Sequence, residues 1–480
     1  MISVQRHPLP VSILKEELAR DQETAFTRLD GQLASYPGKI VVLDDDPTGV
    51  QTVHGLSVYT DWHPGTLDLA FAEERSMFFI LTNSRSMTAQ QTAAVHTELA
   101  HNIYAAADRA GLPFLIVSRS DSTLRGHYPL ETQVLRKQLE ALGHPPFDGE
   151  ILYPFFLEGG RYTLDDTHYV LEDGQLIPAG QTEFAADRSF GFSSSHLPNW
   201  CEEKTGGAIL AQDVACITLD DLRAHQGGLA LQKLVALHDF GKIVVNSTSY
   251  ADVAVLCSAL LQALDMGRHY IIRGAASVAR VLGGIPEQPL LTRERLIQNH
   301  CAEGGIVLVG SYVGRTTQQL EALMESDLAL LYIEFDVDTV REDSRLEREI
   351  ARIMEIVQKE IGEGRSVCVY TSREQAHADS GNPDEQLRLS TRISSAITGI
   401  IGNLNRRPAF IIAKGGITSY DVGVRALGVR RATVMGQVRP GVPVWMTGPE
   451  SRFPSMPYVI FPGNVGSSQT LRDVVEMLLD

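Results

Sequence analysis

Basic residues are scarce relative to acidic ones in this chain of 480 residues. Lys and Arg together number 42, against 59 Asp and Glu, so the formal net charge is −17. A surface that binds nucleic acid through its phosphates needs an excess of Lys and Arg, and no long basic run is present. The composition therefore argues against nucleic acid and anionic membranes as partners. A small anionic substrate stays compatible with it, because such a molecule responds only to nearby charges.

Cysteine and long apolar runs are also scarce. The five cysteines form no CxxC pair, and a chain of this size does not need disulfides, so we expect buried thiols in a reducing compartment. No stretch reaches the roughly 18 consecutive apolar residues of a membrane helix. Charged residues interrupt the first twenty positions, which argues against a signal peptide. We therefore expect a soluble, cytoplasmic protein.

The sequence does contain a series of short apolar runs rich in β-branched residues. They lie at 40–43, 78–81, 114–117, 243–245, 270–272, 306–309, 328–333, 367–369, 410–412 and 459–460. Continuous apolar strands of this kind suit a parallel sheet that helices cover on both faces. Helical patterns lie between them at 89–110, 251–264 and 345–361. This alternation predicts an α/β fold of the doubly wound, mostly parallel kind.

Turn residues and changes of pattern suggest how the chain is divided. Two Gly and two Pro occur within 283–289, which indicates a boundary between two α/β domains. The predicted parts are an N-terminal helical extension, a first domain, a linker and a second domain, at 1–38, 39–284, 285–292 and 293–480. Asp173-Gly174 predicts the turn of a β-hairpin. The polar, weakly periodic stretch at 178–215 predicts loops and short elements.

Three adjacent carboxylates follow the first apolar run, in the segment DDDPTG at 44–49. In doubly wound folds, ligands bind where the strands end at their carboxyl edge. Neighbouring carboxylates repel one another, so the cluster is costly unless a cation or a proton transfer makes use of it. Asp45 and Asp46 are therefore our candidates for a catalytic base that receives a hydroxyl proton. A water-mediated contact with Mg²⁺ and a solvated Asp-Pro turn are the alternatives.

The loop SRSDSTLRG at 118–126 combines two arginines with several hydroxyl groups. Such a set suits a polyhydroxy carboxylate, because Arg can pair bidentately with the carboxylate while hydroxyls bond its hydroxyl groups. An ordinary Arg–Asp surface pair is the alternative. The candidate substrate-binding residues are Arg119, Asp121, Ser122, Thr123 and Arg125, together with Arg85 after the neighbouring run.

Three glycine-containing segments follow strands of the second domain. They are GSYVGRTT at 310–317, KGGIT at 414–418 and PGNVG at 462–466. The first is not a Walker P-loop, because three residues rather than four separate its glycines and Arg stands in place of Lys. A strand and glycine loop that lead into a helix can still hold phosphate through backbone N–H groups. Three such loops favour a nucleotide site over three unrelated tight turns.

Several other motifs are missing. No GxSxG elbow and no strand-following GxGxxG occur, which weakens the hypotheses of a hydrolase and of a dinucleotide dehydrogenase. His96 and His101 are five residues apart and miss the spacing of a helical zinc pair. We therefore assign no metal-ligating residue.

As a set, these motifs resemble those of the four-carbon acid sugar kinase family, over about residues 40 to 466. The resemblance rests on DDPTG at 45–49, RSDSTLRG at 119–126, Gly160-Arg161, Gly310-Ser311, GGIT at 415–418, PGVP at 440–443 and GNVG at 463–466. It implies a sugar-acid-binding first domain and a nucleotide-binding second domain, and it adds Arg161 to the substrate-binding candidates. It also implies that ATP is held by Ser311, Lys414, Gly415, Gly416, Ile417, Thr418, Gly463 and Asn464. Arg119 replaces a Lys of the family pattern, and the opening has a third Asp, so the identity of the acid stays open.

The expected function is that of an ATP-dependent kinase with ATP and Mg²⁺ as cofactors. It would phosphorylate the terminal hydroxyl of a four-carbon sugar acid of the erythronate, threonate or 3-oxo-tetronate type, in a cleft between the two domains. A lyase or aldolase that acts on a phosphorylated sugar acid, and a non-catalytic nucleotide or sugar-acid sensor, are the alternatives. No nucleic acid or membrane partner is expected. The oligomeric state is open, with a homodimer as one option.

Overall fold

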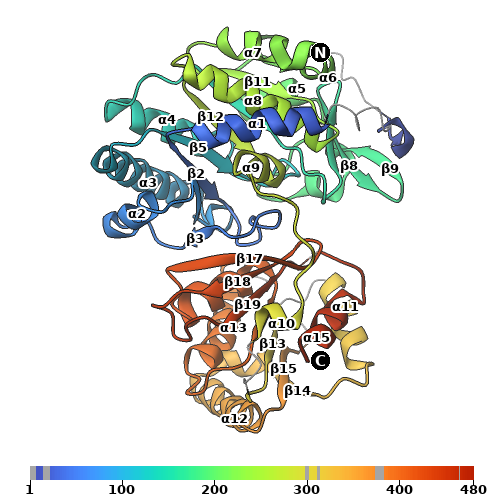
Figure 1. Ribbon diagram of the computed structural model, residues 1–480. Coiled ribbons are helices and arrows are strands. Elements are labelled where there is room, and N and C mark those ends of the chain that lie inside the picture. The colour runs from blue at the N-terminus through green and yellow to red at the C-terminus, as the bar shows by residue number, and fades with distance from the viewer. Residues whose placement is uncertain are drawn as a thin grey trace. The chain divides into compact units, whose positions relative to one another are not determined.

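The computed structural model describes residues 7–14, 22–297, 302–310, 314–372, 383–463 and 465–479 (Figure 1). The chain forms two compact units, of which the first comprises residues 1–53 and 61–287 and the second comprises 54–60 and 288–480. The short segment His54–Thr60 lies inside the range expected for the first domain but folds with the second unit. The reason is β3 (Ser57–Tyr59), which pairs antiparallel with β17 (Arg431–Arg439).

The first unit is built on a parallel sheet of seven strands. In spatial order they are β10 (Ala215–Ile217), β11 (Gly241–Val245), β6 (Gly149–Tyr153), β12 (Tyr270–Gly274), β5 (Phe114–Arg119), β2 (Lys39–Asp44) and β4 (Met77–Leu81). The chain runs from β2 to β4 on one side and then to β5 on the other, so its order reverses between β2 and β5. Ligands of doubly wound folds bind at such a reversal, at the carboxyl ends of the strands.

Helices of the first unit pack into two groups. The first group consists of α1 (Gln22–Ser35), α7 (Gly228–Val235), α8 (Tyr250–Asp265) and α9 (Ala276–Leu282), and the second consists of α2 (Pro64–Phe71), α3 (Ala89–Ala110) and α4 (Leu130–Ala141). The ends of α3 follow from local chemistry: Thr88 and Gln91 form a capping box at its start, and Gly111 ends it at a φ of 65°. In the N-terminal extension, a 3₁₀ turn at Val11–Ile13 precedes α1.

A small antiparallel sheet accompanies the parallel one. It consists of β1 (Leu9–Pro10), β9 (Gln175–Pro178), β8 (Thr167–Glu172) and β7 (Arg161–Leu164). The predicted hairpin is confirmed as β8–β9, and Asp173 and Gly174 in its turn have φ angles of 47° and 78°, as a two-residue hairpin of the primed type requires. The stretch at 178–215 holds short elements, namely η3 (Ala179–Gln181), η4 (Glu183–Ala186), α5 (Leu197–Lys204) and η5 (Ala211–Asp213). The helix α6 (Leu219–Arg223) follows β10.

The second unit has a mixed sheet whose larger part is parallel. In spatial order its strands are β3, β17, β18 (Val442–Thr447), β19 (Pro457–Phe461), β16 (Ile411–Lys414), β13 (Ile306–Val309), β15 (Ser366–Thr371) and β14 (Leu330–Phe335). Neighbours from β19 to β14 pair in parallel, whereas β3, β17 and β18 are antiparallel to their neighbours. The order reverses between β13 and β16, because β14 and β15 lie on one side of β13 and β16 lies on the other.

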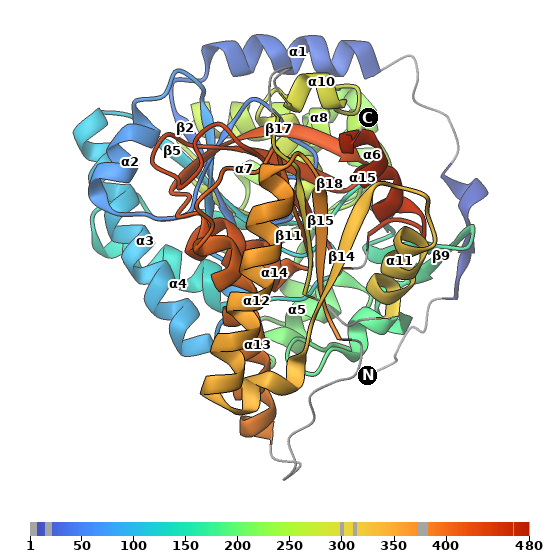
Figure 2. The ribbon, with the colours of Figure 1, turned by 90° about the horizontal axis from the view of Figure 1, so that it is seen from below.

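Helices cover both faces of this second sheet. Figures 1 and 2 show α12 (Asp343–Gly362) and α13 (Pro383–Gly402) on one side, and α11 (Gly314–Met324) and α15 (Thr470–Leu479) on the other. The short helices α10 (Arg293–Leu296) and α14 (Gly416–Tyr420) complete the unit, and the π-helix η8 (Asp421–Ala426) continues α14. No helix in the described part of the chain is long and apolar enough to cross a membrane.

The predicted fold class is confirmed. Each of the ten apolar runs overlaps a strand, and the three predicted helical patterns coincide with α3, α8 and α12. The strands of the first sheet are almost entirely buried, as parallel strands between two layers of helices must be. The β17–β18 hairpin was not predicted.

Candidate functional site

The polar segments that follow β2, β4 and β5 meet at one edge of the first sheet. Asp44, the last residue of β2, lies opposite Arg119, the last residue of β5. The N–H of Asp45 donates to the carbonyl of Arg119 at 3.2 Å, and the N–H of Thr82, after β4, donates to the carbonyl of Asp44 at 2.9 Å. Strand register therefore brings the acidic segment and the arginine loop together at the reversal between β2 and β5.

Arg85 joins the three segments through ion pairs. One end of its guanidinium, Nη2, lies 2.5 Å from Oδ2 of Asp46 and 3.7 Å from Oδ1 of Asp45, and Nη1 lies 3.5 Å from Oδ1 of Asp121. Burial alone would raise the pKa of Asp46, but Arg85 and hydrogen bonds from Thr48 lower it. The carboxylate of Asp46 is therefore already bound by Arg85 and Thr48 and is not free to act as a base.

Asp45 is the acid of this cluster that has no hydrogen-bond donor. Its side chain is 3% exposed, and neither carboxylate oxygen accepts a hydrogen bond from any described residue. The nearest cations are Arg119, whose Nη1 lies 3.6 Å from Oδ1, and Arg85. Burial raises the pKa of Asp45 to about 6, even though both arginines act to lower it. Buried polar groups are ordinarily hydrogen-bonded, so the oxygens of Asp45 have unused capacity to accept a hydrogen bond such as that of a hydroxyl group.

Asp44 belongs to the same cluster, although it was not among the predicted site residues. Its Oδ1 lies 3.4 Å from Nη1 of Arg119, and burial raises its pKa to about 7. The backbone of Gly49 packs directly against its carboxyl group, because a Cβ at that position would lie 2.0 Å from both oxygens. A residue with a Cβ at position 49 would therefore collide with the carboxyl group of Asp44 where it now lies.

Arg125 and Asp121 form a second pair within the loop after β5. The guanidinium Nε of Arg125 lies 2.6 Å from Oδ2 of Asp121, and its Nη1 lies 3.6 Å from Oδ2 of Asp187. The hydroxyl of Thr123 also donates to Asp121. Burial would raise the pKa of Asp121, but Arg85 and Arg125 together hold it well below its usual range. Asp187, which comes from the stretch at 178–215, had not been predicted.

Arg161 differs from the other three predicted arginines. It begins β7, and no Asp or Glu of the described chain lies within ion-pair distance of it. Its Nε is buried without a hydrogen-bond acceptor, and burial lowers its pKa. Its guanidinium group is therefore available to an anion.

Ser122 is buried, and its backbone carbonyl lies 2.7 Å from Nε2 of His168. The other ring nitrogen of His168 lies 2.9 Å from the hydroxyl of Thr163. Burial lowers the pKa of His168 to about 4, so its imidazole is neutral at physiological pH. This contact ties the loop after β5 to the hairpin sheet.

In the second unit, Lys414 ends β16 and is buried, and none of the described residues provides it with an acidic partner. Its Nζ donates to the carbonyl oxygens of Pro462 at 2.5 Å and Gly463 at 3.0 Å, and it lies 4.3 Å from the ring centroid of Phe461. Burial lowers its pKa to about 7, and Arg315 adds to this effect. A buried amino group that has no carboxylate beside it in the described part of the chain suits an anionic ligand.

Gly310 lets the end of β13 approach the segment after β16, because a Cβ at Gly310 would lie 2.5 Å from Oγ1 of Thr418. Gly415 has a φ of 117°, and a Cβ on Gly463 would meet open space. Beside them, the side chain of Ile417 is 68% exposed. Lys414, Gly415, Gly416, Ile417, Thr418 and Gly463 thus lie at one sheet edge, whereas the predicted residues Ser311 and Asn464 lie outside the described part of the chain.

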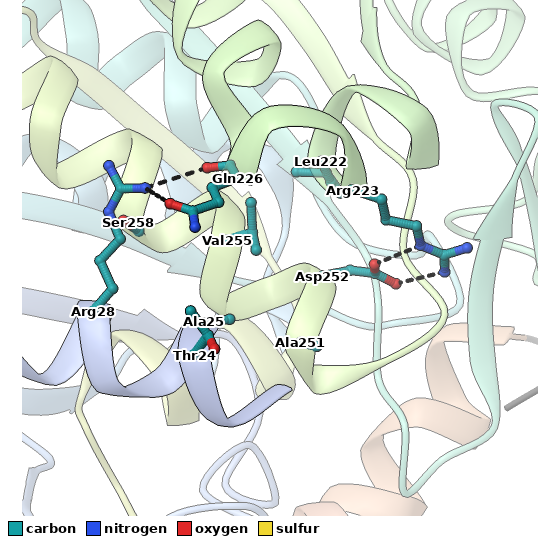
Figure 3. A pocket seen from close by; sticks show the side chains of 10 residues that line it. All are labelled: Thr24, Ala25, Arg28, Leu222, Arg223, Gln226, Ala251, Asp252, Val255 and Ser258. Atoms are coloured by element: carbon teal, nitrogen blue, oxygen red, sulfur yellow. Dashed lines mark hydrogen bonds and ion pairs between the residues drawn. The ribbon is translucent and has the colours of Figure 1, made fainter. Parts of the chain in front are cut away.

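A separate pocket of about 290 Å³ lies between α1, α6 and α8 (Figure 3). Its arginines are already bonded within the pocket wall, Arg28 to Oε1 of Gln226 at 3.3 Å and Arg223 to Asp252 at 3.1 Å. None of the predicted residues lines it. We therefore do not include it in the candidate site.

The described residues contain no group of three or more His, Cys, Asp or Glu side chains that could hold a metal ion. Among these residues Mg²⁺ therefore has no protein site of its own.

Comparisons with known proteins match the two parts of the chain to two different kinds of domain. The model of a sugar-binding N-terminal domain matches residues 40–282, and that of a nucleotide-binding C-terminal domain matches residues 306–471. The chain belongs to the four-carbon acid sugar kinase family. The acidic cluster and its arginines lie in the sugar-binding match, and Lys414 with the glycine loops lies in the nucleotide-binding match.

Solved structures share the fold of this kinase family member. A Haemophilus influenzae protein of the DUF1537 family aligns with a TM-score of 0.59 and 18% identity, over 91% of this chain and 100% of its own. A Salmonella typhimurium protein described as a "putative tRNA synthase" aligns with a TM-score of 0.63 and 17% identity, over 91% of this chain and 98% of its own. No curated protein matches the chain. At these identities the likeness concerns the fold alone.

Proposed function

We propose that the protein is an ATP-dependent kinase that phosphorylates the terminal hydroxyl of a four-carbon sugar acid of the erythronate, threonate or 3-oxo-tetronate type. The observation that carries this proposal is the buried carboxylate of Asp45, which receives no hydrogen bond from the residues that the structure describes and lies among arginines in the sugar-binding part of the chain. Phosphoryl transfer asks a protein mainly for positioning and charge stabilisation, and such a carboxylate can position a hydroxyl group.

At the acceptor end, Asp45 accepts the hydrogen bond of the reacting hydroxyl and takes its proton. Its pKa of about 6 leaves it ionised above neutral pH while making it a stronger base than an exposed aspartate. Asp46 holds Arg85 in place through their 2.5 Å contact. Arg85, Arg119, Asp121, Ser122, Thr123, Arg125 and Arg161 are the proposed substrate-binding residues.

At the donor end, ATP supplies the phosphoryl group that is transferred. The residues described there fit a polyphosphate, because a Cβ at Gly463 would meet open space and because Lys414 has no acidic partner among the described residues. Lys414 and the segment 415–418 would hold the phosphates, together with Gly463. Ser311 and Asn464 stay predictions. Mg²⁺ ordinarily binds through phosphates, water and one or two carboxylates, so we propose that it accompanies ATP.

The cleft between the two domains also stays a prediction. Water must be kept from the transferring group, since an open site would hydrolyse ATP. Two further parts of the proposal rest on the composition. A cytoplasmic location fits the four described cysteines, all of which are free thiols, and small molecules rather than nucleic acid or membranes are the proposed partners.

An assay of ADP release tests the kinase proposal. Purified protein with MgATP is supplied with a panel of four-carbon acids, and we expect turnover with at least one of them and a rise in melting temperature with ATP. A lyase or aldolase would consume a phosphorylated acid without nucleotide, and a sensor would bind without turnover. Absence of turnover with every acid, combined with no effect of ATP on the melting temperature, would refute the kinase.

A further inference from the structure

Phe184 lies beneath two of the arginines in the sugar-binding unit. It belongs to η4, in the stretch at 178–215, which contained no functional motif. The centroid of its ring lies 5.1 Å from Cζ of Arg125 and 5.5 Å from Cζ of Arg161. Both distances fall within the roughly 6 Å at which a guanidinium group is attracted by the face of an aromatic ring. One ring therefore contacts two guanidinium groups.

Arg125 and Arg161 differ in whether a carboxylate lies beside the guanidinium group. Arg125 has carboxylate partners in Asp121 and Asp187. Arg161 has no carboxylate within ion-pair distance in the described chain, and Arg125 repels it. The face of Phe184 is thus a favourable contact that keeps Arg161 beside another cation. A ligand carboxylate would remove this imbalance, because it can accept hydrogen bonds from both guanidinium groups.

Phe184 also packs against apolar side chains. Its side chain packs against an apolar cluster that includes Phe192, Trp200 and Leu197. Asp187, which follows η4 closely, pairs with Arg125. The stretch at 178–215 therefore contributes both an aromatic ring and a carboxylate to the surroundings of the arginines.

The contacts also define a direction across the site. Arg85 contacts Asp45 at one end and Asp121 at the other, and Asp121 in turn contacts Arg125. Asp45 and the pair over Phe184 therefore lie at opposite ends of one chain of contacts. A substrate that places one hydroxyl at Asp45 and extends along this chain of contacts would bring its far end to Arg125.

We propose that Phe184 is a positioning residue that holds Arg161 beside Arg125, so that the pair binds the carboxylate of the substrate at the end opposite the reacting hydroxyl. This inference rests on the proposed function and deepens it. It explains why a terminal hydroxyl would be the one phosphorylated: the acid group is anchored at the other end. It also predicts that Phe184 affects binding of the substrate's carboxylate rather than binding of its hydroxyl groups.

Three variants test the proposal. F184L keeps much of the apolar volume and removes the aromatic face, whereas F184Y restores the face. The control is F190L, in the same stretch, where the ring of Phe190 meets His127 edge-on at 4.9 Å and, among the described residues, is not stacked under any arginine. For each, the melting temperature, kcat and the KM values for the sugar acid and for ATP are measured.

We expect F184L to raise the KM for the sugar acid about tenfold, which corresponds to about 1.4 kcal/mol. Its kcat and its KM for ATP should stay within about twofold of the wild type, and F184Y should recover most of the loss. F190L should lower the melting temperature as F184L does without changing the KM for the acid. The proposal is overturned if F184L and F190L change this KM equally, or if F184Y is no better than F184L.

Calorimetric binding separates this inference from the kinase proposal, because it needs no turnover. Wild type and F184L are titrated with erythronate, with threonate and with erythritol, a four-carbon polyol that has no carboxylate. We expect F184L to weaken binding of the acid that the wild type binds, while the wild type binds erythritol more weakly and F184L changes that affinity little. Equal losses for acid and polyol, no loss for either, or no binding of either acid by the wild type would refute the role of Phe184.

Discussion

Replacing Asp45 by Asn tests the proposed base most directly, because it keeps the size of the side chain and removes its charge. An amide cannot take the proton of the substrate hydroxyl. General base catalysis contributes about 10²- to 10⁴-fold to a rate, so we expect kcat of D45N to fall by about that factor. The KM for ATP should change little, since the nucleotide candidates lie in the other unit.

The same substitution should make the protein more stable at alkaline pH. The pKa of Asp45 is about 6 in the folded chain against an ordinary value of 3.8, so folding disfavours its charged form. Its contribution to stability is fully present below about pH 4 and is lost as the pH rises through about 6. The difference of about 2.2 pKa units corresponds to up to about 3 kcal/mol at pH 8. Asn carries no charge and avoids this loss.

ADP release and thermal unfolding at pH 5 and pH 8 measure the two effects. D68N is the matched control, because Asp68 is 47% exposed and pairs with Arg109 on the surface, and it should change neither kcat nor stability appreciably. We expect D45N to lose activity and to gain stability at pH 8, with a smaller gain at pH 5. A kcat within threefold of the wild type would refute the base, and a D45N protein less stable than the wild type at pH 8 would refute the electrostatic argument.

Two further substitutions test the nucleotide loop and the acidic cluster. In K414M, loss of a charge-assisted contact worth about 1.5–3 kcal/mol should raise the Kd for ATP roughly 10- to 150-fold. The affinity of the wild type for ATP should also weaken as the pH rises above about 7, where Lys414 loses its proton. Calorimetry that shows equal affinities and equal pH profiles for the two proteins would contradict this role. In G49A, the new Cβ would collide with the carboxyl group of Asp44, so unfolding experiments should show a loss of about 1–3 kcal/mol. G65A in α2 is its control, because a Cβ at Gly65 meets open space and should leave stability unchanged or slightly higher; equal melting temperatures for G49A and G65A would contradict the packing argument.

The meeting of Asp45, Arg85 and Arg119 could be predicted from the sequence because strand geometry is regular. An apolar run that ends in polar residues gives both the strand and its carboxyl end, and parallel strands bring such ends to one edge. The same regularity accounts for Lys414 and the glycine loops. The hairpin at 173–174 was predictable for a local reason, since its turn needs residues that tolerate a positive φ.

Contacts between distant irregular segments could not be predicted in this way. Phe184 and Asp187 lie in a stretch with no periodic pattern, and nothing in the sequence indicates that they contact Arg125. The sequence does not indicate the pairing of β3 with β17 either, because a three-residue strand carries little information about its partner.

The amino-acid sequence by itself determined the fold class, the two sheets and the segments that end at their carboxyl edges, because hydrophobic periodicity and turn chemistry are local properties. Only the tertiary structure decided which charges are balanced: Asp46 and Arg125 have partners, whereas no described residue donates a hydrogen bond to the oxygens of Asp45 or places a carboxylate beside Arg161. The physical reason is that charge balance and desolvation depend on distances between side chains that are far apart along the chain.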